Sequence, residues 1–165
     1  MLKIKSLILL LVSFIFFSCS RYYQYNDEQR FSVAYIGGEF DGLLLKNLLT
    51  NYLNSIGLYD SSSNFELQVS ISHSSNLYIT NIDNTSDREN ISSSLSYALT
   101  NNLENCLIHT DQISISQFYI FASADKFLSN KKAIEEIKTN NTEELVKKLI
   151  KKLNSIKMVC DENNR

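Results

Sequence analysis

The chain of 165 residues has no proline, no tryptophan, four glycines and two histidines. Glycine is too scarce and wrongly spaced for a G-x-G-x-x-G or Walker loop that would cradle a phosphate. His73 and His109 have no partners at H-x-x-x-H, H-E-x-x-H or C-x-x-C spacing, so no metal site is expected. Serine is abundant, but no G-x-S-x-G motif and no evident base accompany it. These absences predict a protein that is not an enzyme and uses no cofactor.

Basic residues are slightly outnumbered, with 16 basic against 18 acidic side chains. This balance gives no support for a nucleic-acid partner. The charge is uneven, because residues 61–123 contain one base, Arg88, whereas residues 124–158 contain nine lysines, among them Lys131 and Lys132. Such lysines usually form the solvated face of a helix, but they could also form an anion-binding patch.

An apolar run over residues 7–17 is too short to span a bilayer. Lys3 and Lys5 precede it, and Cys19 follows it after a small residue. The pattern predicts a lipoprotein signal peptide over residues 1–18, cut before Cys19, whose thiol and new amine then carry acyl chains. An ordinary secretory signal cut after Ser20 is the alternative.

Removal of residues 1–18 leaves 147 residues, a length that fits one domain with one core. Residues 19–29 are polar and aromatic and are expected to tether this domain to the lipid. The domain is expected over residues 30–158, followed by a frayed tail over residues 159–165. No Asp follows Cys19, which favours the periplasmic face of the outer membrane over retention in the inner membrane.

Apolar and polar residues alternate in several segments, which predicts strands with one buried face. The four segments are residues 31–37, 65–71, 91–99 and 107–120. The second strand could extend to Ile82 past a serine-rich interruption. Short polar turns separate the last three strands, as in an antiparallel meander.

Apolar residues at helical spacing predict two helices, over residues 44–56 and 131–157. Asp41 could cap the first, and Gly57 suits the left-handed position past its end. Asn141, with Glu144 three residues later, resembles a cap that would break the second helix, although one long helix is favoured. Each helix has one apolar stripe, so both should cover the same face of one sheet. The expected fold is an α+β two-layer sandwich with a four-stranded mixed sheet and the order β-α-β-β-β-α.

This order and several local segments resemble the LPS-assembly lipoprotein family, LptE. Residues 31–57 resemble the family's first strand, glycine-bearing turn and first helix, and residues 65–71 resemble its second strand. Three further segments resemble later elements of the family. The third strand is resembled by RENISSSLSYAL from Arg88 onward, the fourth strand by ISISQFY, and the close of the final helix by EELVKKLIKKL. The chain departs from the family at its mature start, Cys19-Ser20-Arg21 in place of Cys-Gly-Phe, and in lacking prolines before the first strand.

The resemblance implies an outer-membrane lipoprotein that sits with the LptD β-barrel, binds lipopolysaccharide and assists its assembly without turnover. Arg88, Lys131 and Lys132 are the cations available for lipid A phosphates. The small polar residues that alternate with apolar ones along the strands could contact the polar inner wall of a barrel, although ordinary solvent exposure explains them nearly as well. These alternates are Gln68, Ser70, Ser92, Ser94, Ser96, Ser114 and Ser116. The alternative functions are a docking module that activates or regulates a periplasmic envelope enzyme and, third, a carrier of a small hydrophobic ligand.

Cys106 and Cys160 would face an oxidising periplasm. A strand over residues 108–120 covers ~43 Å and a helix over residues 131–157 covers ~40 Å, so the helix should return to the end where the strand began. Cys160 then arrives near Cys106, and a disulfide is expected if their Cα atoms lie within about 7 Å. Two unpaired thiols are an equally open alternative.

Overall fold

The computed structural model describes residues 29–37, 39–79, 87–120 and 127–160. The predicted signal peptide, Cys19, nearly all of the tether and residues 161–165 of the tail therefore lie outside the described residues. None of the described helices is both long enough and apolar enough to cross a bilayer.

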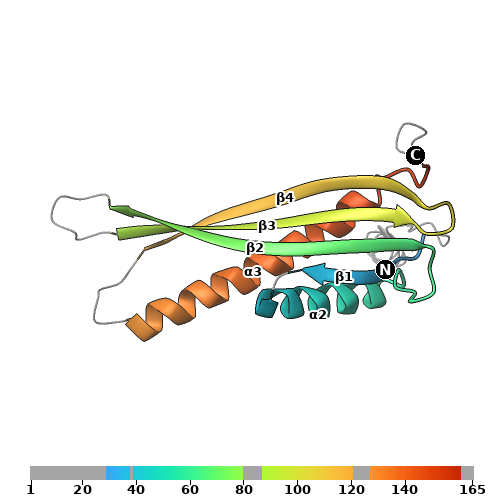
Figure 1. The fold of residues 1–165 in the computed structure, drawn as a ribbon. Helices are drawn as coiled ribbons and strands as arrows, with labels where there is room; N and C mark the ends of the chain where they lie inside the picture. Colours follow the sequence, from blue (N-terminus) through green and yellow to red (C-terminus); the bar gives the residue numbers. More distant parts are fainter. Residues whose placement is uncertain (1–28, 38, 80–86, 121–126, 161–165) are drawn as a thin grey trace, which may run out of the picture.

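Six elements follow one another in the predicted order of strand, helix, three strands and helix. They are β1 (Ser32–Gly37), α2 (Glu39–Ser55), β2 (Phe65–Ile79), β3 (Asp87–Asn101), β4 (Cys106–Ile120) and α3 (Phe127–Leu153). The sheet order is β1-β2-β3-β4, with β1 parallel to β2 and the other neighbours antiparallel. Both helices lie on one face of the sheet (Figure 1). The prediction of an α+β two-layer sandwich with a four-stranded mixed sheet is confirmed.

The core lies between the inner face of the sheet and the two helices. It is built mainly from leucines at four-residue spacing on the helices and from apolar residues at two-residue spacing on the strands. The fully buried leucines are Leu45, Leu49 and Leu53 of α2, Leu145, Leu149 and Leu153 of α3, and Leu67, Leu95 and Leu99 of the sheet. Each contributes roughly 1.5–3 kcal/mol to stability through removal of its side chain from water.

The predicted interruption of the second strand is wrong, because β2 runs without a break from Phe65 to Ile79. Ser74 pairs with Ser92 and Ser75 pairs with Ile91, in a continuous register with β3. The neighbouring strand supplies the backbone hydrogen bonds, which overrides the weak strand preference of serine.

The helix ends differ from those expected. Asp41 is the third residue of α2 and not its cap, whereas Gly57 has the predicted left-handed conformation, with φ of 73°. Asn141 lies inside α3, so the single long helix is confirmed and the cap at Asn141 is wrong. The helix ends at Leu153, four residues before the predicted end. Beyond this point, the backbone N–H of Ser155 bonds the Lys152 carbonyl in a tighter turn that ends the helical ladder.

Candidate functional site

The sheet face turned away from the helices is lined with small uncharged side chains. Five consecutive cross-strand rows on this face contain no charged residue: Gln68–Ala98–Thr110, Ser70–Ser96–Gln112, Ser72–Ser94–Ser114, Ser74–Ser92–Ser116 and Asn76–Asn90–Phe118. We call the residues of these rows other than Phe118 the hydroxyl face. Both helices lie behind it, and no other described element covers it (Figure 1).

Hydrogen bonds between strands order part of this face. Ser116 Oγ donates to Ser92 Oγ at 3.2 Å, and Gln112 Nε2 donates to Ser94 Oγ. Around Ala98, a shallow hollow of about 230 Å³ lies between neighbouring polar side chains. The seven polar alternates expected from the sequence all lie on this face. Ser74 was missed because it lies in the serine-rich stretch that was expected to interrupt the second strand.

At the end of the sheet where β2 finishes, the same face becomes aromatic and aliphatic around Arg88. Tyr78, Arg88 and Ile120 form one cross-strand row, and Phe118 lies in the next. Tyr78, Phe118 and Ile120 are 48%, 67% and 57% exposed, and the two rings meet edge to face with centroids 6.2 Å apart. Arg88 is exposed and forms no ion pair with any described residue. We call these four residues the tip patch, which suits an anion with an apolar body.

Lys131 and Lys132 are exposed near the start of α3. The hydroxyl of Tyr119 donates to Asn130 Oδ1 at 2.7 Å, which joins this part of the helix to the end of β4. The two lysines therefore lie at the same end of the molecule as Arg88, but behind the opposite face of the sheet (Figure 1). The structure brings the three expected cations to one end without gathering them into one cluster.

Cys106 and Cys160 are joined by a disulfide, with Cα atoms 5.9 Å apart. Cys106 begins β4, so the bond lies at the end of the sheet opposite the tip patch. Glu104 Oε2 lies 2.7 Å from Cys160 Sγ, and the ligand atoms of these three residues lie within 4.8 Å of one another. A disulfide sulfur offers no thiolate to a metal ion, so the closed bond excludes this trio as a metal site.

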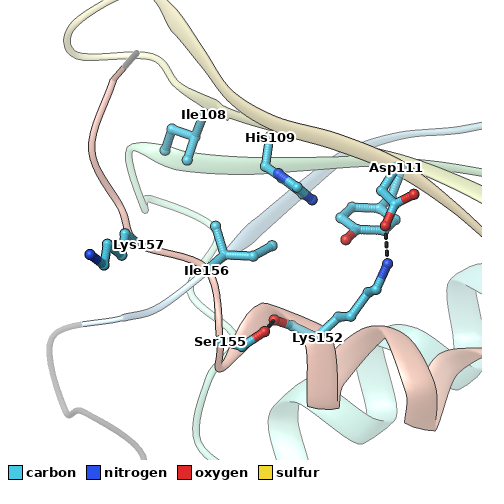
Figure 2. A pocket seen from close by; sticks show the side chains of 8 residues that line it. Ile108, His109, Asp111, Lys152, Ser155, Ile156 and Lys157 are labelled. Atoms are coloured by element: carbon cyan, nitrogen blue, oxygen red, sulfur yellow. Dashed lines mark hydrogen bonds and ion pairs between the residues drawn. The ribbon is translucent and has the colours of Figure 1, made fainter.

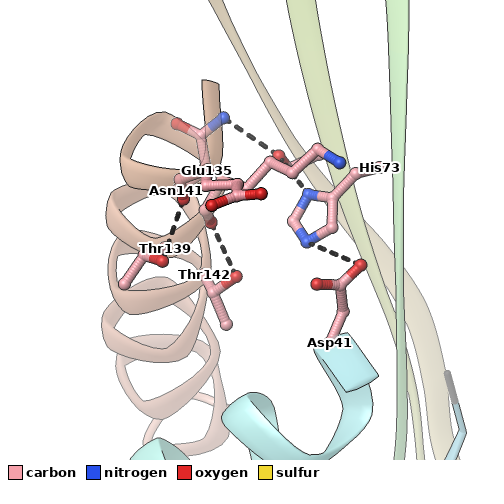
Figure 3. A network of polar contacts seen from close by, with 8 residues as sticks. Asp41, His73, Glu135, Thr139, Asn141 and Thr142 are labelled. Atoms are coloured by element: carbon pink, nitrogen blue, oxygen red, sulfur yellow. Dashed lines mark hydrogen bonds and ion pairs between the residues drawn. The ribbon is translucent and has the colours of Figure 1, made fainter. Parts of the chain in front are cut away.

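A buried polar network joins the helices to the sheet (Figure 3). His73 Nδ1 lies 2.7 Å from Ser93 Oγ, and Asn141 Nδ2 donates to the same oxygen at 2.9 Å. His73 Nε2 lies 4.0 Å from Asp41 Oδ2 and has no hydrogen-bond partner in the part of the chain that the structure describes. An Asp, a His and a Ser thus meet, although no base for any serine was evident in the sequence. Ser93 is fully buried, so a substrate cannot reach its hydroxyl, and the network acts as a structural link.

The stability of the domain is expected to fall in acid because of His73. Burial lowers the pKa of His73, Asp41 raises it less, and Lys138 lowers it further. The unfolded chain, with a histidine pKa near 6.5, therefore takes up the proton first as the pH falls. This contribution to stability is complete above pH 6.5 and is lost below it. Urea unfolding at several pH values should show a steeper loss below pH 6.5 in the native protein than in His73→Gln, and equal slopes would contradict this.

Comparison with known proteins shows a shared fold. No protein-family model matches the chain, and no curated protein matches its sequence. Rare lipoprotein B from Shewanella oneidensis superposes with a TM-score of 0.63 at 11% identity, over 77% of this chain and 95% of that chain. A minor lipoprotein from Acinetobacter baumannii gives 0.58 at 12% identity, over 77% and 91%. A candidate lipoprotein from Caulobacter crescentus superposes with a TM-score of 0.52 at 16% identity, over 76% of this chain and 88% of that chain. The fold is therefore one found among bacterial lipoproteins.

Proposed function

We propose that this chain is an outer-membrane lipoprotein that binds an LptD-type β-barrel and lipopolysaccharide and assists lipopolysaccharide assembly. The signal pattern over residues 1–18 and a fold found in bacterial lipoproteins support the lipid anchor on Cys19. The resemblance of the strands and the last helix to the LptE family supports the choice of partner.

The hydroxyl face is the observation that carries the proposal. A sheet face meant for water usually carries lysine and glutamate, whereas the central part of a protein interface is depleted in charge. Here charged residues flank the five uncharged rows, with Glu66 at one end and Arg88 at the other. Short hydroxyl and amide side chains allow close approach and can hydrogen-bond to the polar inner wall of a barrel. A long, uncharged face therefore fits a barrel wall better than it fits bulk water.

Copurification from detergent-solubilised envelopes tests the partner. We expect a large β-barrel protein to copurify with the native chain. Ser94→Lys places a charge at the centre of the hydroxyl face and is expected to weaken the complex at least about tenfold, because the ammonium must be desolvated. Ser61→Lys, in the exposed turn before β2, is the matched control and should retain the barrel.

Two results of this experiment would contradict the proposal. A Ser94→Lys variant that retains the barrel as well as the control would show that the hydroxyl face is not the contact surface. Capture of a cell-wall synthase in place of a barrel would favour the alternative of a docking module for a periplasmic enzyme.

Lipopolysaccharide binding is proposed to depend on the tip patch. Arg88→Ala is expected to weaken binding about tenfold at low salt, because Arg88 is exposed, forms no ion pair with another described residue and can bind a phosphate with two hydrogen bonds. The Lys131→Ala/Lys132→Ala variant should have a smaller effect, since these lysines lie behind the other face. Lys148→Ala, exposed farther along α3, is the control. Unchanged affinity in both Arg88→Ala and the double lysine variant would place the phosphate contact elsewhere.

A further inference from the structure

Two exposed apolar side chains lie at the end of the sheet that holds the disulfide. Leu103 is in the turn between β3 and β4 and is 76% exposed, and Val159 is in the segment after α3 and is 71% exposed. Val159 directly precedes Cys160, and Glu104, the neighbour of Leu103, lies 2.7 Å from the Cys160 sulfur. The two side chains therefore occupy the same end of the molecule. We call them the apolar pair, and the function proposed above uses neither.

The turn between β3 and β4 holds Leu103 in its exposed position. Asn101 Oδ1 accepts hydrogen bonds from the backbone N–H groups of Leu103, at 3.0 Å, and of Glu104, at 3.4 Å. Asn105 adopts the left-handed conformation that asparagine tolerates, with φ of 50°. Leu103 is the single apolar residue between Asn101 and Cys106. The polar residues fix this turn, and the leucine side chain exposes apolar area to water without adding to the core.

The disulfide fixes the second member of the pair. Ile156 and Met158 pack against the core, whereas Lys157 and Val159, which alternate with them, are exposed. Figure 2 shows Ile156 pointing into the pocket beside β4 and Lys157 pointing away from it. The bond from Cys160 to the start of β4 holds this alternation in place, so Val159 remains on the outer surface.

The chain leads toward Cys19 from the same end. The Ser63 hydroxyl donates to the Arg30 carbonyl, and the backbone N–H of Asn102 donates to the Asn64 carbonyl at 2.8 Å. These contacts place the first described residues beside the turn between β3 and β4. Eleven positions separate Arg30 from Cys19, which span at most about 40 Å at roughly 3.6 Å per residue. A lipid on Cys19 therefore keeps the apolar pair close to the membrane surface.

The charges at this end allow contact with phospholipid. The carboxylates of Asp60, Glu66 and Glu104 each contact a neighbouring group of the protein. Arg30 and Lys157 form no ion pair with any described residue. Cations beside exposed apolar side chains suit a phospholipid surface, where the phosphates lie just outside the acyl chains.

We propose that the apolar pair is a second membrane contact, in which Leu103 and Val159 enter the surface of the phospholipid layer that holds the lipid on Cys19. This contact depends on the anchor proposed above. The anchor keeps the pair at a high local concentration near the surface, so two side chains suffice that would not hold a free protein on a membrane. The contact fixes the direction in which the long sheet extends from the membrane.

Single tryptophans test this contact, because the native chain contains none. Leu103→Trp and Val159→Trp are placed in the acylated full-length protein and bound to vesicles of phosphatidylethanolamine and phosphatidylglycerol. We expect the emission of both to shift to shorter wavelength and to be quenched by brominated acyl chains, since an indole settles at the membrane interface. Leu77→Trp is the matched control and should show neither effect. Leu77 is 57% exposed and lies twelve residues along β2 from Phe65, about 40 Å at roughly 3.3 Å per residue.

A second substitution measures the contribution of the native leucine. Leu103→Asp added to Val159→Trp should reduce the quenching, whereas Leu43→Asp, at a residue of α2 that is 56% exposed, should leave it unchanged. Equal quenching of Leu77→Trp, no quenching of either tryptophan in the pair, or equal effects of the two aspartates would overturn the contact.

Palmitate labelling of the same preparation separates the contact from the anchor. Labelled protein without quenching overturns the contact and leaves the anchor intact. Unlabelled protein overturns the anchor, and the contact with it. Because all four positions are exposed, each variant should keep the circular dichroism spectrum of the native protein.

Discussion

Replacing Cys19 with serine is expected to move the protein from the outer-membrane fraction to the soluble periplasmic fraction. Serine cannot carry the thioether-linked lipid, and without acylation the chain loses an anchor in which each buried methylene contributes about 0.8 kcal/mol. More than one acyl chain makes such an anchor effectively stable, so the shift should be nearly complete. Radiolabelled palmitate and fractionation of the envelope on a sucrose gradient measure the label and the location.

Cys160→Ser is the matched control for this experiment, since it removes a cysteine outside the signal region and should keep the label. A native protein without palmitate would indicate an ordinary secretory signal cut after Ser20. Migration of the labelled protein with inner-membrane markers would contradict the proposed location, while leaving the anchor intact.

Loss of the disulfide between Cys106 and Cys160 is expected to lower the free energy of unfolding by roughly 2–4 kcal/mol. The bond closes a loop between residues 54 positions apart, which restricts the unfolded chain far more than the folded one. Urea unfolding of Cys106→Ser/Cys160→Ser without reductant measures the difference.

Reductant supplies the control for this second prediction. Dithiothreitol should bring the native protein close to the stability of the double variant and should leave the double variant unchanged. Alkylation mass spectrometry of protein taken from the envelope without reductant checks the bond itself. Quantitative labelling of both cysteines would show that the thiols are unpaired in the cell.

The two ends of the sheet have different roles in the proposed function. Because Ser32 pairs with Glu66 at the start of β2, the chain leaves the domain toward residue 29 at the disulfide end. Fifteen residues of β2 separate this end from the tip patch, a distance of about 50 Å at roughly 3.3 Å per residue. An anchor at Cys19 would hold the disulfide end near the membrane, and the hydroxyl face and tip patch would extend away from it.

Local sequence patterns determined the kind of element and the class of fold. Alternation over residues 91–99 and 107–120 and the leucine stripes of both helices have short periods, so they can be read without knowing what each element contacts. Because each element has one apolar face, the helices and the sheet can bury these faces together in only a few arrangements, and the two-layer sandwich is one of them. The approach of Cys160 to Cys106 could also be predicted from the sequence, because the last strand and the last helix have similar lengths and the helix therefore ends near the start of the strand.

Only the tertiary structure decided the features that depend on partners distant in the sequence. Pairing with β3 keeps the serine-rich stretch of β2 in the strand conformation, and the same register aligns the five uncharged rows. His73, Ser93 and Asn141 meet although 20 and 48 residues separate Ser93 from the other two. Arg88 was parted from the lysines of α3 because strand residues alternate between faces, and Arg88 lies on the face opposite the helix. Such contacts depend on register and packing across the whole chain, and no local window of sequence contains them.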